Sequence, residues 1–195
     1  MVPFACLFAT TISRGLGAGI SADAFIRHGI STTIVEIDPA VYDAAREYFG
    51  LAYPGDNHVF LEDARNWVYK RRTAMQSDEE ENLATFDIVI HDCFSGGGLP
   101  EHLFSVEFWN DLKSIMKPDG VVAVVRPNRR HTSSIYADAF GQNVVGSFGS
   151  RPIRAIVTTL LRVFGQCRVF HDLSGPILED ESKSFLNMVG FIPAS

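Results

Sequence analysis

GLGAGISADAFIRHGISTTIVE, residues 15–36, is the stretch of sequence that decides the fold. It opens with glycines at every second position, continues with a segment of helical character over 20–28, and closes with a β-branched run that ends at Glu36. Glycines in front of a helix let the backbone approach a ligand and point N–H groups at it. The stretch therefore predicts a ligand-binding loop and helix followed by a buried strand.

The same alternation of short apolar runs and helix-period segments continues along the chain. Strands are expected over 2–12, 32–36, 58–61, 86–90 and 120–124, and helices over 39–49, 105–116 and 151–164. Strands that alternate with helices form a mainly parallel sheet. The tail offers two more strands, 168–170 and 185–192, that would close the sheet as an antiparallel hairpin. The fold class predicted is α/β, a doubly wound, mainly parallel, Rossmann-like sheet.

Composition predicts one globular domain over residues 1–195 and restricts its partners. The chain has 195 residues, 46% of them hydrophobic, and a formal net charge of -6, which allows a proper core. Because there is no Lys/Arg-rich stretch, nucleic acid is an unfavoured partner. Three scattered cysteines predict neither a disulfide framework nor a metal site, so we expect a reducing, cytoplasmic setting.

Two segments need separate interpretation. Residues 2–12 are apolar but too short to span a bilayer, and they lack a basic flank, so they are interpreted as a strand and no membrane segment is expected. Residues 125–142 carry Arg126, Arg129 and Arg130 in the middle of an apolar context. We interpret 125–142 as a disordered insertion.

Acidic residues at the ends of successive strands are the candidate ligand groups. Glu36 ends the second strand, where a carboxylate can accept hydrogen bonds from ribose hydroxyls; the alternative is a solvated carboxylate. Asp63 follows the third strand and is placed either to meet an adenine amino group or to cap the helix that begins at Ala64. Ile20 stands where a dinucleotide fingerprint needs its third glycine, which argues against NAD or FAD.

Asp92 ends the fourth strand and is the candidate catalytic residue. Ligands of open α/β sheets bind outside the carboxyl ends of the strands, so Asp92 should border the reaction centre. A carboxylate there can orient or deprotonate an amine nucleophile, although it can also merely cap a turn. His91 is expected to point into the packing of the sheet, and His102 is a secondary candidate for the site.

These motifs together resemble a known family. Residues 15–19, Val35-Glu36-Ile37-Asp38-Pro39, Glu62-Asp63-Ala64 and His91-Asp92 with the glycines after it are similar to the spermidine/spermine synthase-like branch of class I S-adenosylmethionine-dependent methyltransferases, including fungal spermidine synthase-like proteins. The resemblance implies that the donor is S-adenosylmethionine or its decarboxylated form. It implies that Asp92 is catalytic and that the cofactor-binding residues are Gly15, Gly17, Gly19, Glu36, Asp63 and Ala64.

Two departures from the family pattern distinguish methyl transfer from aminopropyl transfer. Aminopropyltransferases of the family carry an aspartate in the glycine loop and a second one three positions after the catalytic aspartate, where this chain has Ala18 and Ser95. Two lost carboxylates would leave a cationic polyamine poorly neutralised. Methyl transfer to a small-molecule or protein amine is therefore the leading interpretation, and aminopropyl transfer in polyamine biosynthesis is the alternative.

A noncatalytic binding module that keeps the fold is the third interpretation. It rests on Arg14, which stands where the family's first strand is usually apolar, and on the basic interruption near Arg129. The resemblance also allows a homodimer, because related synthases often pair.

Overall fold

The computed structural model describes residues 6–10, 16–77, 83–93, 100–126, 151–171 and 188–193. Within these ranges the strands form one sheet in the order β3-β2-β1-β4-β5-β7-β6. The parallel part consists of β1 (Cys6–Thr10), β2 (Ser31–Val35), β3 (Val59–Phe60), β4 (Phe86–His91) and β5 (Met116–Arg126). At the other side, β7 (Met188–Pro193) pairs antiparallel with both β5 and β6 (Arg168–His171).

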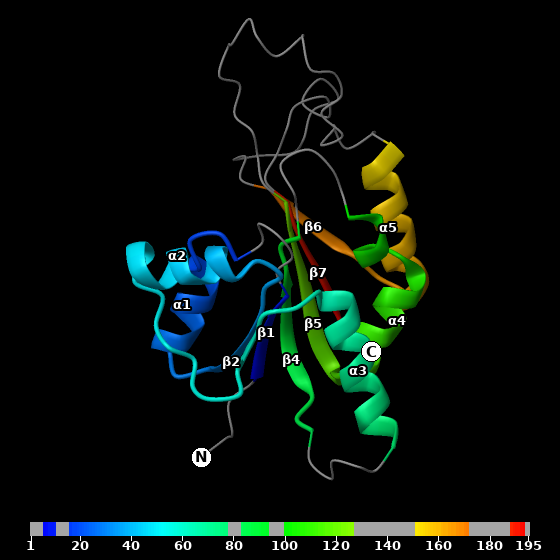
Figure 1. Cartoon of the computed structure of the whole chain (residues 1–195). Coiled ribbons are helices and arrows are strands. Elements are labelled where there is room, and N and C mark those ends of the chain that lie inside the picture. The colour runs from blue at the N-terminus through cyan, green and yellow to red at the C-terminus, as the bar shows by residue number, and fades with distance from the viewer. Residues whose placement is uncertain are drawn as a thin grey trace, which may run out of the picture.

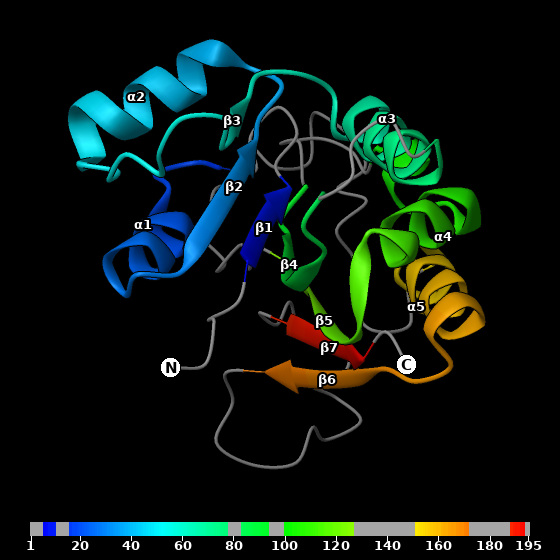
Figure 2. The same ribbon diagram turned by 90° about the horizontal axis from the view of Figure 1, so that it is seen from below.

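Helices cover both faces of this sheet (Figures 1 and 2). One face carries α1 (Ile20–Arg27) and α2 (Pro39–Phe49), and the other carries α3 (Ala64–Gln76), α4 (Val106–Ser114) and α5 (Arg151–Phe164). A 3-10 turn, η1 (Glu101–Leu103), precedes α4. From β1 the chain winds outward through β2 to β3, and it later returns to the centre with β4 beside β1. The predicted α/β, doubly wound architecture is confirmed.

The helix ends lie where capping chemistry predicts them. Asp38 caps α2 by accepting from the backbone N–H of Ala40, Pro39 follows as the first helical residue, and Gly50 ends the helix with φ 70°. This arrangement uses the preference of proline for the first helical position and of glycine for the left-handed C-terminal position. The bounds predicted for α2 are therefore confirmed, as are those of α5.

Each face of the sheet has its own core. The larger core joins the sheet to α3, α4 and α5 through buried side chains such as Trp67, Phe108 and Trp109. The smaller core joins it to α1 and α2 through Leu16, Ala22, Ile34, Ala45 and Leu51. The loop after β1 therefore contributes a residue to a hydrophobic core, which restrains it.

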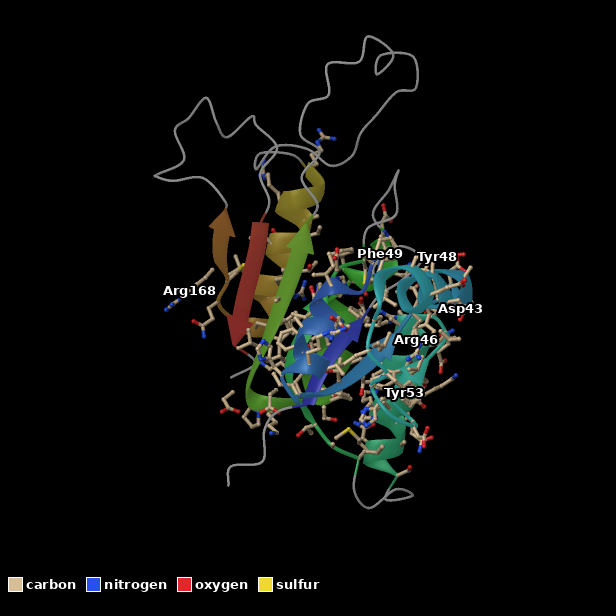
Figure 3. The ribbon with its side chains drawn as sticks, turned by 90° about the vertical axis from the view of Figure 1, so that its left-hand side faces the viewer. Asp43, Arg46, Tyr48, Phe49, Tyr53 and Arg168 are labelled. Carbon is tan, nitrogen blue, oxygen red and sulfur yellow. The ribbon has the colours of Figure 1, made fainter. Side chains whose placement is uncertain are left out.

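The outer side of α2 is exposed and aromatic (Figure 3). Tyr48 and Phe49 are 73% and 63% exposed, and the guanidinium of Arg46 lies 5.2 Å from the ring centre of Tyr53. On the inner side of the same helix, Ala45 is fully buried. Val41 and Tyr42 also pack, partly buried, against the smaller core, so α2 contacts the rest of the domain through these two residues and Ala45.

The segment before the expected fifth strand differs from the sequence prediction. The sequence Lys117-Pro118-Asp119-Gly120, between the helix expected over 105–116 and the strand expected over 120–124, is typical of a turn, but these residues lie inside β5. The register shifts there, because Phe86 faces Met116 whereas Ile88 faces Val121, so the extra residues of β5 are accommodated as an irregularity in the pairing. The strand is irregular at these residues, but it does not end there.

Two other expectations fall partly outside the described residues. β5 extends through Arg126, so the first two residues of the 125–142 segment belong to a strand, and residues 127–142 lie outside the described ranges. The residues that connect β6 to β7, 172–187, also lie outside them. None of the helices within the described ranges is both long and apolar enough to cross a membrane.

Candidate active site

The predicted site residues gather along one edge of the sheet. Because β1 to β4 are mutually parallel, their carboxyl ends lie at the same edge. The glycine loop follows β1, Glu36 follows β2, Asp63 comes after β3, and Asp92 follows β4. The chain reverses its direction of winding between β1 and β4, and such a switch point is where open α/β sheets bind ligands.

The glycine loop is a tight turn that needs its glycines. The N–H of Gly19 donates to the carbonyl of Leu16 at 2.7 Å, and Gly17 and Gly19 have φ values of 51° and 73°. A Cβ added to Gly19 would lie 3.1 Å from Leu51 Cδ1, whereas one added to Gly17 would meet no atom of the described residues within 4 Å. Gly17 therefore leaves room for a ligand, and Gly19 provides close packing. Gly15 lies outside the described residues.

A second layer of contacts fixes Leu51 beneath Gly19. Asp23 of α1 accepts from the backbone N–H of Ala52 at 2.9 Å, and its other oxygen pairs with Arg27 at 2.5 Å. Arg27 in turn donates to the carbonyl of Gly50. Together, Asp23 and Arg27 hold the segment after α2 against α1, so the glycine loop rests on a fixed support.

Glu36 joins the glycine loop to the start of α2. Its Oε2 accepts from the N–H of Leu16 at 3.2 Å, and its Oε1 accepts from the N–H of Asp38 at 2.9 Å. The side chain is fully buried, so the alternative of a solvated carboxylate is wrong. A buried carboxylate needs such partners, because an unpaired one would cost several kcal/mol. Glu36 was expected to accept hydrogen bonds from ribose hydroxyls. In this structure its carboxylate instead accepts from the backbone of the glycine loop and of Asp38.

Asp63 caps α3, as one of its two interpretations predicted. Its Oδ1 accepts from the N–H of Asn66 at 3.0 Å, and its Oδ2 lies 3.5 Å from Nε2 of His102. Ala64, the first residue of α3, is fully buried in the larger core. The whole residue, backbone included, has no exposed surface, so a ligand could contact Ala64 only if the groups that cover it moved.

Asp92 is a half-buried acid immediately after β4. Burial raises the pKa of its carboxyl to about 6, because desolvation disfavours the charged form. Cys93, the next residue, is fully buried in the larger core and anchors this end of the strand. An acid with such a pKa is ionised at neutral pH and is a stronger proton acceptor than an ordinary carboxylate.

His91 lies in an aromatic cluster behind Asp92. Its ring centre is 4.8 Å from those of both Phe104 and Trp109, and the side chain is fully buried. Neither ring nitrogen has a hydrogen-bond partner in the described part of the chain. Burial, offset only in part by nearby backbone, lowers the pKa of His91 to about 4. His91 therefore packs as predicted, as a neutral ring.

Sequence reasoning missed one residue that touches this edge. Arg65, in the first turn of α3, donates from Nη1 to the carbonyl of His102 at 3.2 Å and to Oγ of Ser105 at 3.0 Å. The partners lie 37 and 40 residues further along the chain. A local sequence pattern cannot predict a hydrogen bond between residues that are so far apart in the chain.

Comparison with known proteins identifies one matching family, two related sequences and a solved structure of similar fold. The sequence profile of the spermine/spermidine synthase domain matches residues 17–160. The chain is 34% identical over 194 residues to the N-terminal histidine N-methyltransferase of Emericella nidulans, covering all of this chain and 30% of that protein. It is 30% identical over 156 residues to the polyamine aminopropyltransferase of Vibrio vulnificus, covering 75% of this chain and 50% of that protein.

A solved structure agrees on the fold. The structure of human methyltransferase-like protein 13 in complex with SAH superposes with a TM-score of 0.64 and 19% identity, over 96% of this chain and 71% of that one. At this identity the likeness concerns the fold alone. The chain spans about a third to a half of the length of the curated relatives named above.

Proposed function

The chain belongs to the spermine/spermidine synthase family, and on that premise we propose that it is an S-adenosylmethionine-dependent methyltransferase that acts on an amine nitrogen. The observation that carries the proposal is Asp92, whose pKa is raised to about 6, at the end of β4 beside the switch point of the sheet. The glycine loop and Glu36 lie at the same edge.

The residues of this edge fit an adenosyl donor. Gly17 has open space where a side chain would stand, so a ligand can approach the backbone. Gly15, Gly17 and Gly19 would hold the methionine portion, Glu36 the ribose, and Asp63 with Ala64 the adenine. Because Ala64 is fully buried, its contact with the adenine requires the groups that cover it to move. Because Glu36 is buried under the loop it braces, ribose contact requires residues 16–17 to shift and uncover its carboxylate, each oxygen of which keeps a second lone pair.

When bound, the donor supplies a methyl group activated by the positive sulfur. The acceptor nitrogen forms the new C–N bond as the C–S bond breaks, its electron pair passing to sulfur. The protein's own contribution is to align the acceptor and to take its proton on the Asp92 carboxylate. Since an ammonium group cannot attack, the ionised form of Asp92 is the active one.

Two observations favour methyl over aminopropyl transfer. Ala18 provides no carboxylate in the glycine loop, and Ser95 provides none after Asp92. The relative matched along the whole chain is a methyltransferase by name, and its name gives an N-terminal histidine as the acceptor. We propose the α-amino group of a peptide as the acceptor class. Aminopropyl transfer to a polyamine stays the second candidate, because of the aminopropyltransferase relative.

Calorimetric titration with two donors tests the proposal. S-Adenosylmethionine should bind at least about tenfold more tightly than its decarboxylated form, a difference of about 1.4 kcal/mol. The active donor should then methylate a synthetic peptide with an N-terminal histidine, followed by mass, and leave putrescine unchanged. Tighter binding of the decarboxylated donor with consumption of putrescine would reverse the order of the two candidates.

The noncatalytic alternative has its own signature. The noncatalytic interpretation would be supported if the folded chain bound neither donor and if Glu36→Ala changed none of its measured binding affinities. Arg14 and Arg129, on which this interpretation rests, lie outside the described residues. A cytoplasmic location and a homodimer likewise stay predictions.

A further inference from the structure

Arg65 holds the segment that leads into α4. Its Nη1 bridges the carbonyl of His102 and Oγ of Ser105, at 3.2 and 3.0 Å. Ser105 is also the cap of α4, since its Oγ accepts from the N–H of Phe108 at 3.2 Å. One guanidinium therefore ties the first turn of α3 to the end of η1 and to the start of α4.

Asp63 reinforces the same connection from the preceding turn. One carboxylate oxygen caps α3 at Asn66, and the other faces Nε2 of His102 at 3.5 Å. Arg65 thus holds the backbone of His102, and the Asp63 carboxylate lies beside its side chain. The adenine side of the proposed site is joined in this way to residues 102–105.

Residues 102–105 reach the catalytic side through one packed ring. Phe104 is 6% exposed, and its ring meets that of His91 edge-on with centres 4.8 Å apart. His91 is the last residue of β4 and directly precedes Asp92. The segment 102–105 therefore connects the two sides: Asp63 and Arg65 contact it at His102 and Ser105, and its Phe104 packs on His91, the residue before Asp92.

We propose that Arg65 is a positioning residue that sets where Asp92 lies relative to the Asp63 turn. The proposal rests on the proposed methyl transfer for its kinetic part only. A displacement of about 1 Å at a reacting group costs up to roughly a hundredfold in rate. Arg65 touches no reacting atom, so its effect is transmitted through η1 and the ring of His91.

Arg72 provides a matched control on the same helix. It joins α3 to α4 through an ion pair with Asp111 at 2.9 Å, two turns further along and away from the strand ends. Arg65→Met removes the guanidinium that donates to neutral oxygens of His102 and Ser105, and Arg72→Met removes the guanidinium that pairs with Asp111, so each variant deletes one arginine link from α3 toward α4. Arg65→Lys restores a donor at the first position without the guanidinium fork.

The kinetic test uses the full chain with the N-terminal histidine peptide. Arg65→Met should lower kcat about 10- to 100-fold while the Kd for S-adenosylmethionine changes less than about threefold. Arg65→Lys should recover part of the loss, and Arg72→Met should keep kcat within about twofold. Equal losses in Arg65→Met and Arg72→Met would reduce Arg65 to a stability role and overturn the proposal.

A second readout does not depend on activity. In protein labelled with carbon-13 at aspartate carboxyls, with Asp92→Asn used for assignment, the Asp92 resonance of the unaltered chain should titrate near pH 6. In Arg65→Met the midpoint should fall toward the ordinary value, because Asp92 becomes more solvated, and in Arg72→Met it should stay. An unchanged midpoint in Arg65→Met would overturn the proposal, whereas absent donor binding with a shifted midpoint would contradict only the proposed function.

Discussion

Replacing Glu36 by glutamine tests whether the glycine loop is braced from below. In the structure both carboxylate oxygens accept backbone N–H groups, from Leu16 at 3.2 Å and from Asp38 at 2.9 Å. A glutamine side chain has one acceptor oxygen and one amide nitrogen. If the oxygen keeps the shorter bond to Asp38, the amide nitrogen faces the N–H of Leu16, and two donors then oppose each other.

The size of the effect follows from burial. A hydrogen bond to a charged group contributes about 1.5–3 kcal/mol, and an unsatisfied buried donor costs about 1–3 kcal/mol. Because Glu36 is fully buried, water cannot replace the lost partner. We expect Glu36→Gln to lower the free energy of unfolding by about 2–3 kcal/mol and to lower Tm by roughly 4–12 °C.

Urea unfolding followed by tryptophan fluorescence measures the loss directly, since both Trp67 and Trp109 are buried. Glu47→Gln, which neutralises an exposed carboxylate on α2, is the control and should stay within about 0.5 kcal/mol of the unaltered chain. Donor affinity should fall in Glu36→Gln and not in Glu47→Gln. Equal unfolding free energies for the two variants would refute the bracing role of Glu36.

Three further results are expected. Asp92→Asn should lower methyl transfer about 10²- to 10⁴-fold, and kcat/KM of the unaltered chain should fall as pH drops through about 6, where the carboxyl with its raised pKa becomes protonated; a pH-independent rate below 6 would contradict the role of Asp92. In the Asp92→Asn variant, the free energy of unfolding should decline by up to about 3 kcal/mol as pH falls from about 6.5 to 4. The reason is that the pKa of His91 is lowered to about 4 in the folded chain, so the unfolded chain binds the proton at a higher pH. Adding His91→Leu should remove this pH dependence, as measured by urea titration. Gly19→Ala should destabilise the chain more than Gly29→Ala, since both glycines have φ 73° but only Gly19 has a neighbour, Leu51 at 3.1 Å from the added Cβ, and similar melting temperatures for the two variants would contradict that packing.

The helices show what sequence can predict. α5 was expected over 151–164 from its apolar period, and it forms over Arg151–Phe164. α2 is bounded by Asp38 and Gly50, whose side-chain and backbone chemistry act locally. Signals of this kind act between neighbouring residues and do not depend on the rest of the fold, so helix ends can be predicted from a short stretch of sequence.

The strand β5 shows where local signals are overridden. Lys117-Pro118-Asp119-Gly120 is typical of a turn, yet pairing with β4 extends the strand through it by a shift of register. Whether turn residues end a strand or are included in it as an irregularity depends on the neighbouring strand. That neighbour, Phe86 to His91, is remote enough in sequence to leave no trace in the local pattern.

The sequence predicted that the candidate site residues would gather at one edge of the sheet, but it did not predict the contacts between them. The order of strands brings the glycine loop, Glu36, Asp63 and Asp92 to one edge, as parallel topology requires. The hydrogen bond between Leu16 and Glu36 and the bridge from Arg65 to Ser105 were not predicted, because they span 20 and 40 residues. Which side chains hydrogen-bond across the edge of the sheet is known only once the folded structure is known.

A crystal structure of the chain soaked with S-adenosylhomocysteine is the most direct test of the proposed donor site. We expect the sulfur of the ligand between the turn at Gly17–Gly19 and the Asp92 carboxyl, with the ribose beside Glu36. An adenosyl group bound at any other surface, or a turn still closed over Glu36 at millimolar ligand, would contradict the account.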